Sequence, residues 1–204
     1  MAKLNDFVAK SYFEILRLTP AATAAQVDRA FKYLSGALGS SSDPGSTALA
    51  DLLSEAHAAL LDPVRGAEYR SLAAKKDNAK ALKRRRELEA DPKLERVTLA
   101  IAARKLGEAS VLIEWAGKLH PERPDLAAHR VVLEFHLSND QTTADKAMGE
   151  VKRARSKRDT SELRLYHAWF AARARDRATA ESLLADEDGT HPLYREAMDL
   201  LTRS

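Results

Sequence analysis

The residues in this chain that come closest to forming a metal or acid–base site are histidines with a carboxylate nearby. His129 and His136 lie seven positions apart with Glu134 between them, so a helix would place both imidazoles on one face. That spacing separates them by two helical turns, roughly 10 Å along the axis, which is too far for one metal ion to bridge. The zinc-binding, phosphate-binding and nucleophile-elbow motifs of common enzymes do not occur. We therefore expect no catalytic residue, no metal site and no cofactor, and we do not expect an enzyme.

Two runs of basic residues offer a different chemistry, which is contact with phosphate groups. Residues 71–96 carry nine basic against five acidic groups, whereas residues 97–204 carry seventeen of each. Clustered Lys and Arg suffice for phosphate contacts, but neither run has the interleaved aromatic side chains on which bases stack. We favour solvated helix faces and keep weak nucleic-acid binding as an alternative. The first run comprises Lys75, Lys76, Lys80, Lys83, Arg84, Arg85 and Arg86, and the second spans residues 152–158.

The composition is that of a helical globular protein. The chain has 204 residues, of which 45% are apolar and 31% charged, enough for one large or two small domains. Strictly alternating runs of Val, Ile and Thr are absent, so we expect an all-α fold. Cysteine is absent, and no apolar run approaches the roughly 18 residues of a membrane span. We expect a cytoplasmic location, no disulfide and no membrane partner.

The helical patterns begin near the N-terminus and divide the chain into three parts. Pro20 ends a short first helix, and a second runs to about Leu38. A loop at Ser40–Ser46 leads to a third helix that can pack antiparallel to the second. We expect a continuous helix from Arg65 to about Glu89, ended by Asp91-Pro92. The expected parts are a domain at 1–72, a solvated basic linker helix at 73–93 and a second domain at 94–204.

Four groups of residues in the first part recur at the spacing of a known family. They are Tyr12, Phe13, Ile15, Leu16, Val27, Ala30, Phe31, Leu34, Leu53, Glu55, Ala56, Leu60, Asp62, Pro63, Arg65, Ala67 and Tyr69. By these residues the first part resembles a J domain. The family's His-Pro-Asp motif follows the second helix, where this sequence has Gly39, Ser40 and Ser41 instead. The resemblance implies a J-like helical hairpin without the working motif, whose partner is a DnaK-type chaperone or a true J protein.

The last part of the chain shows a repeat of about 35 residues. Small residues recur at Ala109, Ala144 and Ala180, and turn residues split each unit into two helices. By this pattern the last part resembles a short solenoid of tetratricopeptide repeats. The expected pairs are 95–106 with 108–119, 125–137 with 142–156, and 161–174 with 177–187, followed by a closing helix from Pro192.

The resemblance to repeats implies a concave groove for a peptide or a partner helix. If Ala144 and Ala180 are equivalent, His129, Leu133 and His136 of the middle unit correspond to Leu165, Trp169 and Arg173 of the third, at positions that face the groove. An equally weighted interpretation places the apolar members of this set in the core. We expect a non-enzymatic adaptor that binds other proteins. The alternative is a co-chaperone that docks on a chaperone or J protein without stimulating ATP hydrolysis.

Overall fold

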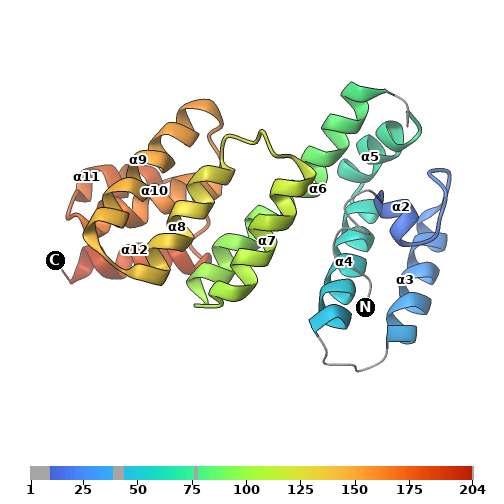
Figure 1. Cartoon of the computed structure of the whole chain (residues 1–204), viewed down its shortest axis with the longest axis horizontal. Coiled ribbons are helices and arrows are strands. Elements are labelled where there is room, and N and C mark those ends of the chain that lie inside the picture. Colours follow the sequence, from blue (N-terminus) through green and yellow to red (C-terminus); the bar gives the residue numbers. More distant parts are fainter. Residues whose placement is uncertain (1–9, 39–43, 76–77, 204) are drawn as a thin grey trace. The chain divides into compact units, whose positions relative to one another are not determined.

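The fold is described from a computed structural model of the chain, which covers residues 10–38, 44–75 and 78–203 (Figure 1). All regular secondary structure in these ranges is helical, which confirms the expected all-α class. The chain divides into two compact units, Met1–Glu89 (unit 1) and Ala90–Ser204 (unit 2). Position 39–41, where the J family has its motif, and Lys76 lie outside the described residues.

Unit 1 contains a short helix, an antiparallel pair and a second short helix. Ser11 starts the first helix with a capping box, in which its hydroxyl accepts from the Glu14 amide and Glu14 accepts from the Ser11 amide. The third helix begins at Pro44, inside the expected loop, because proline suits the first helical turn. The helices are α2 (Tyr12–Ile15), α3 (Ala24–Leu38), α4 (Pro44–Leu61) and α5 (Arg65–Ala73), with α3 packed on α4.

The expected continuous helix from Arg65 is interrupted. Helix α5 ends at Ala73 and α6 (Ala79–Ala102) starts anew, because the Asn78 side chain accepts from the Ala81 amide at 3.0 Å and caps it. Tyr69 is buried as expected, whereas Ala67 is exposed and does not join the core.

Helix α6 also continues through Pro92, where the sequence predicted its end. A proline inside a helix removes one hydrogen bond and costs about 3 kcal/mol. Leu94, Val97 and Ile101, which follow it, are almost completely buried, and that burial offsets the cost. The expected linker at 73–93 is not a solvated helix either, since the side chains of Glu89 and Lys93 are each 2% exposed.

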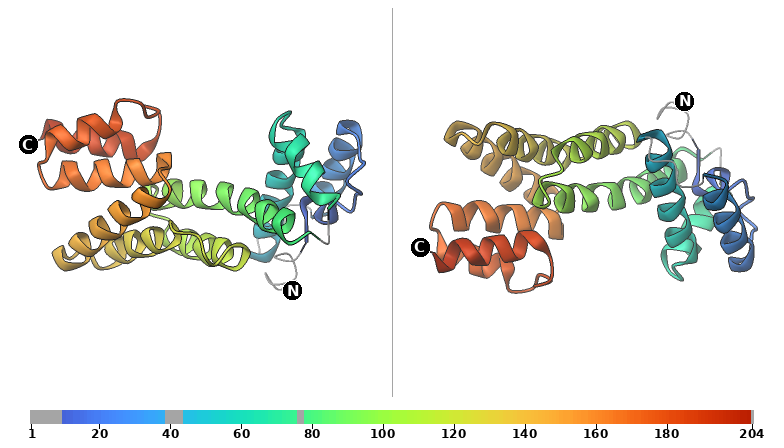
Figure 2. Two further views of the ribbon diagram at one scale, coloured as in Figure 1. Left: turned by 90° about the horizontal axis from the view of Figure 1, so that it is seen from above. Right: turned by 90° about the horizontal axis from the view of Figure 1, so that it is seen from below.

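Unit 2 consists of the second half of α6 and six further helices (Figure 2). The helices are α7 (Leu106–Leu119), α8 (Leu126–Ser138), α9 (Gln141–Lys157), α10 (Ser161–Arg173), α11 (Arg177–Leu184) and α12 (Pro192–Thr202). Helices α7 to α11 each pack on the next along the chain, and α12 packs mainly on α10. The bounds of α7 to α11 agree with the expected helices to within a few residues, and side chains of Asp140, Thr160 and Asp176 cap three of them. The expected first helix, 95–106, is instead the last part of α6 and ends at Ala102.

Three left-handed residues mark a repeat in unit 2. Arg104, Asn139 and Arg175 have φ values of 59°, 54° and 63°, and each follows the first helix of a pair. They lie 35 and 36 positions apart, which is the period expected from the sequence. After Arg104 and Arg175 the next amide bonds back to a carbonyl five positions earlier, at 2.8 and 2.9 Å, so both helices end in a Schellman turn.

Candidate partner-binding surfaces

The six residues expected to face a groove do not share one surface. His129 and Leu165 are 1% and 2% exposed, and Leu133 and Trp169 are also buried. The groove expectation is wrong for His129 and Leu165, because packing between helices covers both side chains; Nδ1 of His129 lies 3.2 Å from the Tyr166 hydroxyl. The core interpretation holds for them. Only His136, which is half-buried, and Arg173, which is exposed, reach solvent with polar groups.

The correspondence between the two repeats also needs a correction. The left-handed caps Asn139 and Arg175 set an offset of 36 positions. That offset makes His136 equivalent to Ala172 rather than to Arg173. His136 and Arg173 therefore have different positions in their repeats.

Unit 2 should lose stability in acid because of His129. Burial lowers the pKa of His129 to about 4; Asp125 opposes this effect and Arg123 adds to it. As the pH falls below 6.5 the unfolded chain binds a proton that the folded chain does not accept until about pH 4. The free energy of unfolding should therefore fall by about 3 kcal/mol between pH 7 and pH 4 from this residue. Urea titrations followed by tryptophan fluorescence measure the change. The variant His129→Leu should lose correspondingly less stability over the same interval, and an equal loss would contradict the assignment.

Four helical segments converge at a group of five residues, which we call the cationic cluster: Arg104, His136, Trp169, Arg173 and Glu196. The guanidinium of Arg104 donates to Nδ1 of His136 at 2.5 Å and lies 3.9 Å from a Glu196 oxygen. The indole N–H of Trp169 donates to the same Glu196 oxygen at 3.1 Å. The rings of His136 and Trp169 lie 5.3 Å apart. The Glu196 carboxylate on α12 therefore contacts both Arg104, which follows α6, and Trp169 on α10.

Within the cationic cluster, the guanidinium of Arg173 stacks on aromatic rings. Its guanidinium carbon is 5.1 Å from the ring centre of Phe135 and 5.9 Å from that of Trp169. Within the described ranges, no carboxylate lies within 4.0 Å of its guanidinium nitrogens. The ring contacts hold a positive charge at the surface that forms no ion pair with the acidic side chains the structure describes.

Histidine protonation does not add to this charge at neutral pH. Burial, together with the neighbouring charges of Arg104 and Arg173, lowers the pKa of His136 to about 4. The cluster therefore carries two positive charges against one negative charge. Of its members, the sequence pointed to His136, Trp169 and Arg173; it gave no signal for Arg104 and Glu196, which only the fold brings together.

A shallow groove lies between α7 and α8 in the same unit. Its volume is about 380 Å³, and its apolar lining comes from Ile113, Leu133 and Leu137, the last of which is 68% exposed. Glu114 pairs with Lys118 at 2.6 Å and Glu134 with Lys146 at 2.8 Å along its rim. These pairs leave the rim acids neutralised within the chain.

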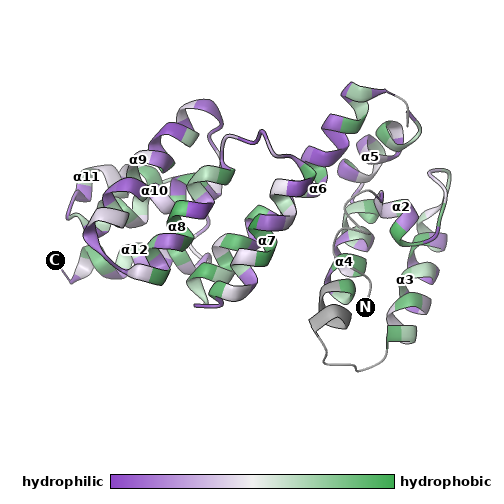
Figure 3. Cartoon of the chain, in the orientation of Figure 1, coloured by the Kyte–Doolittle hydropathy of each residue, from purple (hydrophilic) through white to green (hydrophobic). Residues whose placement is uncertain are grey.

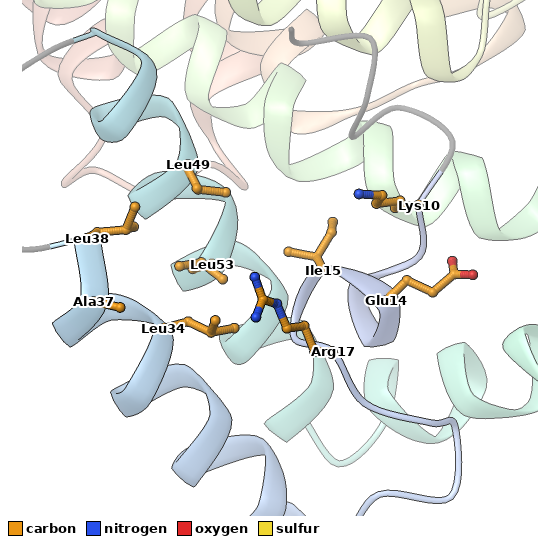
Figure 4. Close-up of a pocket in the computed structure, with 9 residues that line it drawn as sticks. All are labelled: Lys10, Glu14, Ile15, Arg17, Leu34, Ala37, Leu38, Leu49 and Leu53. Atoms are coloured by element: carbon orange, nitrogen blue, oxygen red, sulfur yellow. The ribbon is translucent and has the colours of Figure 1, made fainter. Parts of the chain in front are cut away.

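Unit 1 has a deeper pocket between α2, α3 and α4 (Figure 4). Its volume is about 320 Å³. The side chains around it are mostly apolar, and Lys10, Glu14 and Arg17 stand at its edge.

Only some side chains of the first basic run are exposed at the surface. Lys75, Lys80 and Lys83 are exposed, as expected, and this part of α6 appears largely hydrophilic in Figure 3. Arg84 pairs with Glu68 at 2.7 Å and with Glu87 at 3.1 Å, and Arg86 is half-buried. Arg85 does not belong to the surface, because it is 8% exposed and pairs with Glu89 at 3.3 Å inside unit 1.

The second basic run is engaged within the chain. Arg153 pairs with Glu150, Arg155 with Asp159, and Arg158 with Asp91. These pairs reduce the charge available for phosphate contacts, which favours the solvated-face interpretation.

Across residues 10–38, 44–75 and 78–203, no group of three or more His, Asp or Glu side chains is placed to hold a metal ion. No helix in the described part of the chain is long and apolar enough to cross a membrane.

Comparison with known proteins gives no relative: the chain matches no protein-family model, no curated protein and no solved structure. Function is therefore inferred from the residues and their geometry.

Proposed function

We propose that this protein is an adaptor that binds an acidic segment of a partner protein at the cationic cluster of unit 2. The observation that carries the proposal is the charge of Arg173, which is exposed, stacked on aromatic rings and without a carboxylate within 4.0 Å among the described residues. A partner carboxylate would supply the missing negative charge.

Arginine suits this task better than lysine. A guanidinium presents a planar fork of donors that matches a carboxylate with two hydrogen bonds. Stacking on Phe135 and Trp169 already orders Arg173, which reduces the side-chain entropy lost on binding. Tryptophan and arginine are also the residues that most often dominate the energy of protein interfaces.

For unit 1 we propose the J-like character that its sequence resembles. The order of a short helix, a long antiparallel pair and another short helix supports this proposal. On α3, Arg29 and Lys32 are both exposed. The co-chaperone alternative keeps a DnaK-type chaperone or a J protein as the partner of this unit.

Trp169 provides a direct probe of the cluster. The chain has two tryptophans, so the variant Trp115→Phe leaves Trp169 as the only reporter and keeps an aromatic ring beside Lys93. We expect an N-acetylated hexaglutamate peptide to change the fluorescence of Trp169, with an affinity that weakens as salt is added. A hexaglutamine peptide should have no effect.

Substitution of Arg173 tests the same site. Arg173→Gln should weaken peptide binding at least tenfold, about 1.4 kcal/mol. The matched control is Arg177→Gln, since Arg177 is exposed on α11 and pairs with Glu181 at 2.8 Å. Equal affinity in Arg173→Gln and the control, or equal binding of both peptides, would refute the proposal.

A further inference from the structure

The pocket of unit 1 is walled by apolar side chains on three helices. They are Ile15 from α2, Leu34, Ala37 and Leu38 from α3, and Leu49 and Leu53 from α4. Figure 4 shows these side chains directed toward a common space. Leu34, Leu49 and Leu53 lie inside helices, where the backbone N–H and C=O groups bond within the helix. Those walls offer a ligand apolar contact and no hydrogen bonds.

The charged residues at the edge are arranged asymmetrically. In Figure 4 the side chains of Lys10 and Arg17 extend over the pocket, whereas the Glu14 carboxylate points away from it. Arg17 is held in the left-handed region, with φ of 57°, by the turn that ends α2. In that turn the Leu18 amide donates to the Phe13 carbonyl at 2.7 Å. Arg17 therefore places a positive charge at the edge of a pocket whose walls are apolar.

The size of the pocket indicates the length of an apolar ligand. A cavity of about 150 Å³ holds benzene, with six carbon atoms. The pocket has a volume of about 320 Å³, roughly twice that, which corresponds to a chain of about eight to twelve carbons. A single leucine of a docked peptide would leave most of this space empty, and its backbone would find few partners on the walls.

We infer that unit 1 binds a free medium-chain fatty acid, with its alkyl chain in this pocket and its carboxylate beside Arg17. This site is separate from the cationic cluster of unit 2, which serves the proposed adaptor function. Fatty-acid binding would give the adaptor a small-molecule ligand in addition to a protein partner.

Calorimetric titration of the full-length protein with sodium decanoate, below its micelle-forming concentration, tests the inference. We expect one decanoate per chain, and at least tenfold weaker binding of decanol, which lacks the charge. Vesicles containing anionic phospholipid should not bind. Binding of vesicles without binding of decanoate would overturn the inference in favour of a membrane surface.

Two variants separate ligand binding from folding. Arg17→Gly removes the cation but suits the left-handed backbone, so it should raise the urea midpoint while weakening decanoate binding at least tenfold. Ala37→Leu should fill the pocket and abolish binding. The control Lys32→Gln, at an exposed position of α3 that does not line the pocket, should bind like the wild type.

The outcome is independent of the proposed function of unit 2. Arg173→Gln should bind decanoate normally, and Arg17→Gly should bind hexaglutamate normally. Equal decanoate affinity in the wild type, Arg17→Gly and Ala37→Leu, or no decanoate binding at all, would overturn the fatty-acid site.

Discussion

Replacing Arg123 by alanine is expected to lower the free energy of unfolding of unit 2 by about 3–5 kcal/mol. The guanidinium of Arg123 is almost completely buried and bonds to both oxygens of Asp125, at 2.9 and 2.6 Å. A third nitrogen donates to Asp91 at 2.6 Å, and Arg158 donates to the same Asp91 oxygen at 2.8 Å. The variant would leave Asp125, which is 1% exposed, without its main partner.

The pKa of Asp125 provides a second measurement on the same variant. Burial raises the pKa of this carboxyl, but hydrogen bonds and charge from Arg123 outweigh burial and hold it below the ordinary value. The stability that this pair contributes is present above the unfolded pKa of about 3.9 and is lost as the pH falls through the folded pKa. Arg123→Ala should abolish that part of the acid dependence.

Urea unfolding followed by tryptophan fluorescence measures the effect, because both tryptophans, Trp115 and Trp169, belong to unit 2. The control is Arg177→Ala, which breaks an exposed pair with Glu181 and should cost less than about 0.5 kcal/mol. A similar cost for the two variants would show that burial does not decide the energy of the Arg123 network.

Replacing Glu89 by alanine is expected to destabilise unit 1 by a comparable amount, about 3–5 kcal/mol. Glu89 is 2% exposed and accepts a hydrogen bond from the Tyr69 hydroxyl. Arg85 lies 3.3 Å from it and is itself buried, so the variant would leave a buried positive charge without this carboxylate. The Tyr69 oxygen also accepts from the Tyr12 amide at 2.8 Å, which connects α2 to α5 and α6.

Circular dichroism detects this loss, since unit 1 contains no tryptophan. Glu87→Ala is the matched control. Glu87 lies two positions before Glu89 on α6 and forms a more exposed pair with Arg84. This control should cost less than about 1 kcal/mol. Glu89→Gln should fall between the two, since the amide can still accept from Tyr69 but carries no charge. A cost for Glu89→Ala no larger than that for Glu87→Ala would contradict the prediction.

Helix positions were the most predictable part of this molecule. The pairs of unit 2 follow from period 3.6 in apolar residues and from local signals such as Asp140, Asp176 and Pro192, which act within a few residues of themselves. The failures at Asn78 and Pro92 have different causes. At Asn78 a single side-chain cap decides between one helix and two, and at Pro92 burial of later residues outweighs a local penalty.

Contacts between distant segments could not be predicted from the sequence. The exposed basic run was expected to include Arg85, yet Arg85 is buried and pairs with Glu89, whose carboxylate also accepts a hydrogen bond from Tyr69 on α5. Arg104 and Glu196 carried no recognisable motif and meet only because α6 and α12 belong to one folded unit. Such pairings depend on how helices pack against one another. That packing cannot be predicted from residue types and their spacing along the chain.

The left-handed caps at Arg104, Asn139 and Arg175 allow such a chain to gain or lose whole helix pairs. Each cap ends a helix through bonds to its own last turn, and the following helix starts at the next residue or two. The junction is therefore self-contained, and a gene segment of about 35 codons joined at these positions would add one helix pair without disturbing the ends of its neighbours. Tandem duplication followed by divergence is a simple route to this architecture, and it would leave the caps in place after the sequences between them had ceased to resemble one another.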